Sequence, residues 1–141
     1  MNSKMFNSSI LADSFIENSC SKDFSLLSRI QLNSKADYIR AEQQALECAN
    51  YLTSTPFDRN NWKWESAEHF LLLWINGTSD FTFKLNQTIC KIIKSNFALL
   101  SIYFAYATKF VLENRDKSKD EKEICNNVVP LLIDYCKNQS N

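Results

Sequence analysis

The side chains best suited to acid–base chemistry lie between Thr55 and Phe83. This stretch holds the only histidine of the chain, His69, and the acids Glu65 and Asp80. On a helix, Glu65 and His69 are four residues apart and share a face, so the carboxylate can orient the imidazole. Acid–base catalysis needs a further group within reach, and Asp80 is the candidate. One hypothesis is therefore a small-ligand binder or hydrolase-like enzyme that uses these three residues.

Aromatic and acidic neighbours extend this candidate site. Trp62 and Trp64 are two residues apart at the start of a predicted helix, so they cannot share a face. We expect one ring to be buried and the other to be exposed, where it can stack on a ligand or a partner. Asp58 and Glu68 complete the set of candidate ligand- or partner-binding residues. The alternatives are aromatic packing over the helix N-terminus and, for the acid–histidine pair, a helix-surface ion pair.

The cysteine and glycine patterns predict no metal site and no cofactor. A single histidine and the lack of any C-x-x-C pair leave no ligands at zinc-site spacing. One glycine cannot form a phosphate-binding loop, and no serine lies in a G-x-S-x-G elbow. We expect the five thiols to act as small apolar side chains; they belong to Cys20, Cys48, Cys90, Cys125 and Cys136.

The charge balance and the hydropathy pattern bear on partners and location. With 16 basic and 16 acidic residues the formal net charge is zero, so no nucleic-acid binding is expected. The basic face of Lys84, Lys91 and Lys94 is interpreted as a solvated surface. No segment reaches the roughly 20 apolar residues of a membrane span, and the start of the chain lacks the apolar core of a signal peptide. A cytoplasmic location is the expectation, unless the chain begins after a cleaved signal.

The scarcity of turn-forming residues predicts an all-α fold. The chain has one glycine and two prolines in 141 residues, whereas sheets and barrels need turn glycines. The most apolar stretch runs from Phe97 to Leu112, and we expect it to form a central buried helix at about 97–113. Four to five principal helices are expected to pack around it as an orthogonal bundle or a short helical array. Residues 34–138 form a single helical domain in this prediction, and residues 1–33 a poorly ordered segment with short helical turns.

The first two helices are predicted from apolar periodicity and terminal signals. Ser34, with Asp37 three residues later, fits a capping box that opens a helix of about 34–53. Its end is set by Pro56, because the residue before a proline leaves the helical region. The next helix covers 62–76 and buries Trp74, and Gly77 is expected to follow it as a left-handed C′ residue.

The helix before the central one and the final helix are predicted in the same way. A helix beginning near Leu85 is expected to break at about 95–96 before the central helix. Ser118 and Glu121 fit a capping box that opens the final helix, and Pro130 is expected to kink it. The predicted apolar stripe of that helix is Ile124, Val128, Leu131 and Tyr135.

The central helix itself has two unlike faces. At 100° per residue, small side chains form one stripe, and bulky ones lie opposite. We expect the small stripe to permit close approach of a neighbouring helix. The small set is Ala98, Ser101, Ala105 and Thr108, and the bulky set is Leu99, Tyr103, Tyr106 and Phe110.

Two segments resemble an uncharacterised family of small helical proteins from Bacteroidetes-type bacteria. These are YLTSTPFD, residues 51–58, and FLLLWINGTSDFTF, residues 70–83. In that family a helix ending in S-T-P is followed by a helix ending in W-x-x-G-T-x-D-(F/Y)-T-F. The resemblance implies an all-α domain without an established activity, often exported to the periplasm or beyond. The matching positions, none of which has an assigned catalytic role, are Thr55, Pro56, Trp74, Gly77, Thr78 and Asp80.

The function that the sequence favours is a non-enzymatic helical interaction or structural module. Its expected partner is another protein or a second copy of the chain, as in a homodimer. The enzyme or small-ligand hypothesis around Glu65, His69 and Asp80 remains the alternative. For the remaining named positions we predict structural roles: Pro56 and Gly77 at helix ends, Trp74 in the core, and Pro130 within the last helix.

Overall fold

This computed structural model describes one part of the chain, residues 24–94, 96 and 98–139. Six α-helices and two short 3₁₀ helices lie in this part and are joined by loops. Predictions that concern residues 1–23 lie outside this part. Within it no β-strand occurs, so the all-α prediction is confirmed. The 3₁₀ helices are η2 (Phe24–Arg29) and η3 (Arg115–Lys117), and the α-helices are α1 (Lys35–Arg40), α2 (Glu42–Ser54), α3 (Trp62–Gly77), α4 (Gln87–Ile93), α5 (Leu99–Glu113) and α6 (Glu121–Gln139).

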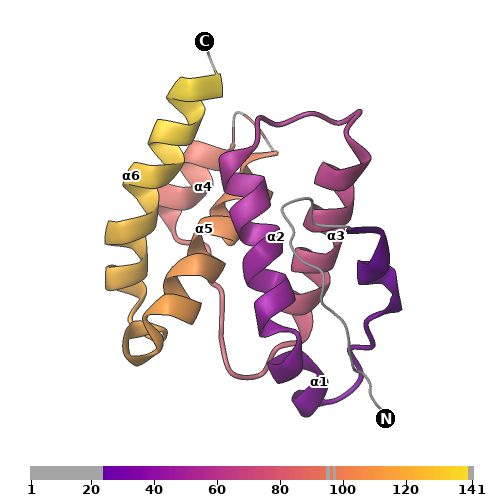
Figure 1. The fold of residues 1–141 in the computed structure, drawn as a ribbon. Coiled ribbons are helices and arrows are strands. Elements are labelled where there is room, and N and C mark those ends of the chain that lie inside the picture. The colour runs from indigo at the N-terminus through magenta and orange to yellow at the C-terminus, as the bar shows by residue number, and fades with distance from the viewer. Residues whose placement is uncertain (1–23, 95, 97, 140–141) are drawn as a thin grey trace.

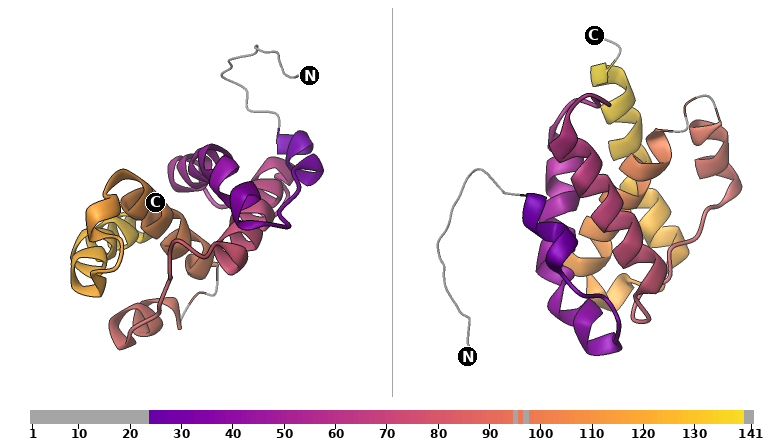
Figure 2. Two further views of the ribbon diagram at one scale, coloured as in Figure 1. Left: turned by 90° about the horizontal axis from the view of Figure 1, so that it is seen from below. Right: turned by 90° about the vertical axis from the view of Figure 1, so that its right-hand side faces the viewer.

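Helix α5 is the centre of the packing. Figure 1 shows α2 and α6 running upwards and α3 and α5 running downwards, and Figure 2 shows α5 between the α2–α3 pair and α6. Its most extensive contact is with α2, followed by α6, and it also touches α3 and α4. The prediction of a central helix at about 97–113 is therefore confirmed.

The close approach of α5 and α2 follows from their small side chains. On α5, Ser101, Ala105 and Thr108 are all buried. The buried face of α2 is also made largely of small residues, among them Ala45 and Ala49. Small side chains let two helix backbones come near each other, so the largest helix–helix contact in the molecule forms along these two stripes.

The first predicted helix begins as expected but is interrupted. Ser34 accepts a hydrogen bond from the Asp37 N–H, and the Asp37 carboxylate accepts one from the Ser34 N–H, so the capping box is confirmed. Ala41, with φ −86° and ψ 1°, then separates α1 from α2, which the periodicity alone did not indicate. Before Pro56, Thr55 is extended, and α2 ends at Ser54 as predicted.

The role expected of Gly77 is wrong in its details. Gly77 is the last residue of α3, its φ lies outside the left-handed region, and Thr78 is the C-cap residue. A Cβ at position 77 would overlap the end of the Tyr38 side chain. Glycine is therefore needed here for close packing between α3 and α1. Trp74 strengthens the same contact, because its indole N–H donates to the Tyr38 carbonyl over 3.0 Å.

The break between α4 and α5 is confirmed, whereas the start of α6 differs from the prediction. Helix α4 ends at Ile93 and α5 begins at Leu99. The Glu123 N–H donates to Asp120 Oδ1 over 3.1 Å, so Asp120 rather than Ser118 caps α6. Ser118 is buried in the preceding turn instead.

The buried stripe of α6 also differs at one position. Leu132 is fully buried, and Leu131, which the stripe included, is 45% exposed. These two leucines are adjacent, about 100° apart around the helix, and the sequence pattern does not separate them. Pro130 lies inside α6 as predicted, on its exposed side.

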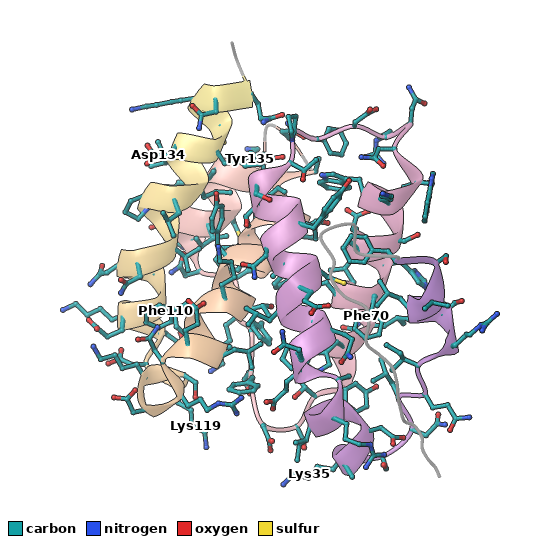
Figure 3. All side chains as sticks on the ribbon, in the orientation of Figure 1. Lys35, Phe70, Phe110, Lys119, Asp134 and Tyr135 are labelled. Atoms are coloured by element: carbon teal, nitrogen blue, oxygen red, sulfur yellow. The ribbon has the colours of Figure 1, made fainter. Side chains whose placement is uncertain are left out.

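A hydrogen bond at one end of the bundle and an ion pair at the other connect segments that are distant in sequence. The Tyr135 hydroxyl donates to the Thr55 carbonyl over 3.4 Å, and Figure 3 labels Tyr135 between the upper ends of α6 and α2. At the opposite end, Arg115 forms an ion pair with Glu42. No helix within the described residues is long and apolar enough to cross a membrane.

Candidate functional site

The structure does not bring the candidate acid–base residues into one site. Glu65 and His69 are both exposed on α3, and no hydrogen bond or ion pair joins these two described residues. Asp80 lies beyond the end of α3, after about 12 Å of helical rise between His69 and Gly77. Its carboxylate is 3.5 Å from Lys35 Nζ. Among the described residues, Asp80 is therefore paired with Lys35 and not with His69 or Glu65.

The two tryptophans have the unlike environments that their spacing predicts. Trp64 is buried and packs edge-on against Phe57, with ring centroids 4.8 Å apart. Trp62 is 52% exposed, and Lys63 Nζ lies 6.0 Å from its ring centroid. Asp58 is exposed in the preceding connection, where its Oδ1 accepts a hydrogen bond from the Asn60 N–H. Trp62 alone among these residues offers an aromatic face to a partner.

Glu68 joins two helices. The Ser101 hydroxyl of α5 donates to the Glu68 carboxylate of α3. Glu68 is half-buried and Ser101 is buried, so this hydrogen bond stabilises the contact between α3 and α5. A structural role is thus present for Glu68, which the sequence placed among the binding candidates.

A hollow of about 280 Å³ lies between η2 and α3, and we call it the η2–α3 hollow. In Figure 1 η2 lies beside α3 on the right-hand side of the molecule. Phe70, labelled in Figure 3, contributes to the lining of the hollow. Its apolar lining residues are Phe24, Leu27, Ile30, Leu32, Phe70 and Leu73, and its polar ones are Ser25, Ser28, Ser66 and His69.

The chemistry of the η2–α3 hollow favours apolar side chains. Among the described residues that line it, His69 is the only titratable one, and none is an acid, a lysine or an arginine. Leu73, one of its lining residues, is 46% exposed. An exposed leucine in the lining of an apolar hollow is typical of an interaction surface. The hollow was not predicted, because the packing of η2 on α3 has no periodic signal in the sequence.

The side chains with strongly shifted pKa values lie in the core instead. Burial raises the pKa of the Cys48 thiol to about 12. It also raises the pKa of Tyr103 and of Tyr135 to about 12. These shifts keep the three groups protonated and uncharged at neutral pH, as expected for residues that serve packing.

The candidate metal ligands and the predicted basic face can be located in the described residues. No group of three or more His, Cys, Asp or Glu side chains there is arranged to hold a metal ion. On the predicted basic face, Lys84 Nζ lies 2.9 Å from a Glu121 carboxylate oxygen. An acidic side chain is therefore interleaved with the lysines of that face.

Comparison with known proteins yields no match: no family model, no curated protein and no solved structure matches this chain. The resemblance to the Bacteroidetes-type helical family therefore stays a prediction.

Proposed function

We propose that this chain is a non-enzymatic helical interaction module that forms a homodimer through the η2–α3 hollow. The observation that carries this proposal is an exposed leucine in the lining of an apolar hollow. Leu73 is 46% exposed and lines the η2–α3 hollow. A two-fold dimer needs a self-complementary patch in which each copy supplies what the other accepts. Leu73 of each copy then packs into the hollow of the other.

The size of the hollow supports an occupant made of side chains. Its volume of about 280 Å³ is just below the roughly 300–1,000 Å³ of pockets that enclose small ligands. Serine hydroxyls at its edge, from Ser25, Ser28 and Ser66, supply a polar rim around an apolar centre. An apolar centre with a polar rim is the usual anatomy of a protein interface.

The enzyme alternative has less support. Of its three candidate residues, His69 alone lines the hollow, and Glu65 and Asp80 do not. The described lining residues offer His69 no second titratable group for acid–base catalysis.

Sedimentation velocity over a range of concentrations tests the proposal. We expect the wild-type chain to dimerise, and we expect Leu73→Asp to weaken dimerisation by about tenfold or more, because it places a charge in an apolar hollow. Leu131→Asp is the matched control, since Leu131 is 45% exposed but lies on α6. A wild-type chain that stays monomeric at every concentration would refute the proposal, and so would equal weakening by the two variants.

A further inference from the structure

A second cavity lies at the opposite side of the bundle, near the C-terminal end of α6. It has a volume of about 350 Å³ and we call it the C-terminal cavity. Figure 1 shows the α2–α3 connection and the end of α6 together at the top of the molecule, where this cavity lies. Three segments far apart in the sequence supply its lining: Phe57; Asn96, Ala98, Leu99 and Ile102; and Tyr135, Cys136 and Gln139.

The described residues that line the C-terminal cavity carry no charge at neutral pH. No aspartate, glutamate, histidine, lysine or arginine is among them. Its two titratable groups are protonated, because burial raises the pKa of Tyr135 to about 12 and also raises the pKa of Cys136. A charged ligand would lose its hydration here without an opposite charge to replace it.

Hydrogen bonds between the segments hold the cavity in shape. The Phe57 N–H donates to Gln139 Oε1 over 3.2 Å, and the Tyr135 hydroxyl donates to the Thr55 carbonyl over 3.4 Å. The Ala98 N–H donates to Asn96 Oδ1 over 3.0 Å. These contacts fix the lining before any ligand arrives, which reduces the entropic cost of binding.

The same hydrogen bonds determine what a ligand must supply. Asn96 and Gln139 each use their amide oxygen within the protein. Among the described residues neither carboxamide NH₂ group has an acceptor, so each can donate to an oxygen on a ligand. The Phe57 and Tyr135 rings, with Leu99 and Ile102, suit an aromatic or otherwise flat apolar body.

We infer that the C-terminal cavity binds a small uncharged aromatic molecule that carries a carbonyl or amide oxygen. The volume is within the range of small-ligand pockets, the lining is apolar with a few fixed polar groups, and it excludes ions. This inference is independent of the dimer proposal, since it concerns other residues on another side of the bundle.

Benzamide and benzoate form the decisive pair of probes, because they share one shape and differ in charge. Cys136 lines the cavity and reports occupancy through its rate of alkylation by N-ethylmaleimide, followed by peptide mass spectrometry. Cys90 is exposed on α4 and serves as the reference in the same molecule. With a Kd of about 1 mM, typical of so small a ligand, benzamide at about 10 mM should slow Cys136 alkylation roughly tenfold and leave Cys90 unchanged.

Benzoate at the same concentration should give no protection. The inference is overturned if benzamide leaves the Cys136 rate unchanged, if benzoate protects equally well, or if Cys90 slows in parallel. Ala98→Trp fills the cavity from the start of α5 and should abolish the protection, whereas Ala36→Trp, at an exposed position on α1, should preserve it. Persisting protection in a folded Ala98→Trp variant also rules the cavity out. The wild-type comparison decides the question even if that variant does not fold.

Discussion

Thr108 places a hydroxyl in the centre of the core, at 0% exposure. Among the described residues its Oγ1 atom has no hydrogen-bond partner, and the same is true of the Trp64 indole nitrogen. A buried polar group without a partner costs about 1–3 kcal/mol of stability. The small stripe of α5 therefore includes one residue whose polarity opposes folding.

We expect Thr108→Val to raise the free energy of unfolding by about 1 kcal/mol or more, because it removes the buried hydroxyl and keeps a similar shape. Urea denaturation followed by circular dichroism measures the change. Thr88→Val is the matched control, since Thr88 is exposed on α4, and its effect should stay within about 0.5 kcal/mol. A lower stability for Thr108→Val would mean that the hydroxyl is satisfied in solution.

Gly77 illustrates how far a single residue type can be interpreted from sequence. A lone glycine after an apolar helix correctly predicted the end of α3. The structural reason for a glycine at this position differs from the predicted left-handed C′ residue. The side chain of Tyr38, 39 positions earlier, occupies the space that a Cβ would need. A contact between residues so distant in sequence has no local signal, whereas a left-handed C-cap does, and the local explanation was therefore preferred.

At the scale of the element, the contact of α2 with α5 determines how tightly the bundle closes. Ala105 lies on the small stripe of α5 and is fully buried. The stripe was predicted from the sequence because a 3.6-residue period shows which side chains share a face. What the period does not show is the neighbour, which the structure identifies as α2.

Ala105→Leu is expected to lower the free energy of unfolding by about 1–3 kcal/mol, because the added methyl groups overpack the interface. Differential scanning calorimetry or urea titration gives the value. Ala36→Leu, at an exposed position of α1, is the control and should be nearly neutral. An unchanged or higher melting temperature for Ala105→Leu would show that α2 and α5 can move apart with little loss of stability.

Helix boundaries were predictable where the capping group is local and unambiguous. Ser34 and Asp37 form the capping box that their spacing indicates. At the start of α6 two acceptors compete, and Asp120 caps the helix although Ser118 has the typical capping-box spacing to Glu121. The difference depends on η3, the 3₁₀ turn before α6, which the sequence pattern did not reveal.

At the scale of the whole molecule, the candidate surfaces depend on contacts that connect distant segments. The η2–α3 hollow needs Phe24–Arg29 to pack on α3, and the C-terminal cavity needs three segments to meet. The sequence predicted which helices are amphipathic but not which loop lies beside which helix end. The sequence also could not show whether His69 and Asp80 lie close enough to act together. In the structure, Asp80 forms an ion pair with Lys35.

Two buried phenols make the stability of the fold depend on pH in the alkaline range. Burial raises the pKa of Tyr103 and of Tyr135 from 10.0 to about 12 in the folded chain. Once unfolded, both should ionise near 10, so between pH 10 and 12 the unfolded state holds fewer protons than the folded state. Stability is therefore fully present below about pH 10 and is lost as pH rises towards 12.

We expect the free energy of unfolding to be flat from pH 7 to 9 and to fall above pH 10, approaching about 1.4 kcal/mol per pH unit for each of the two phenols. Urea denaturation at stepwise pH values measures this slope. Tyr135→Phe should reduce the slope by up to half while changing stability at pH 7 only by its weak hydrogen bond to Thr55. If Tyr135→Phe and wild type lose stability in parallel, the Tyr135 phenol is not protected by burial, and its contact between α6 and the end of α2 is open in solution.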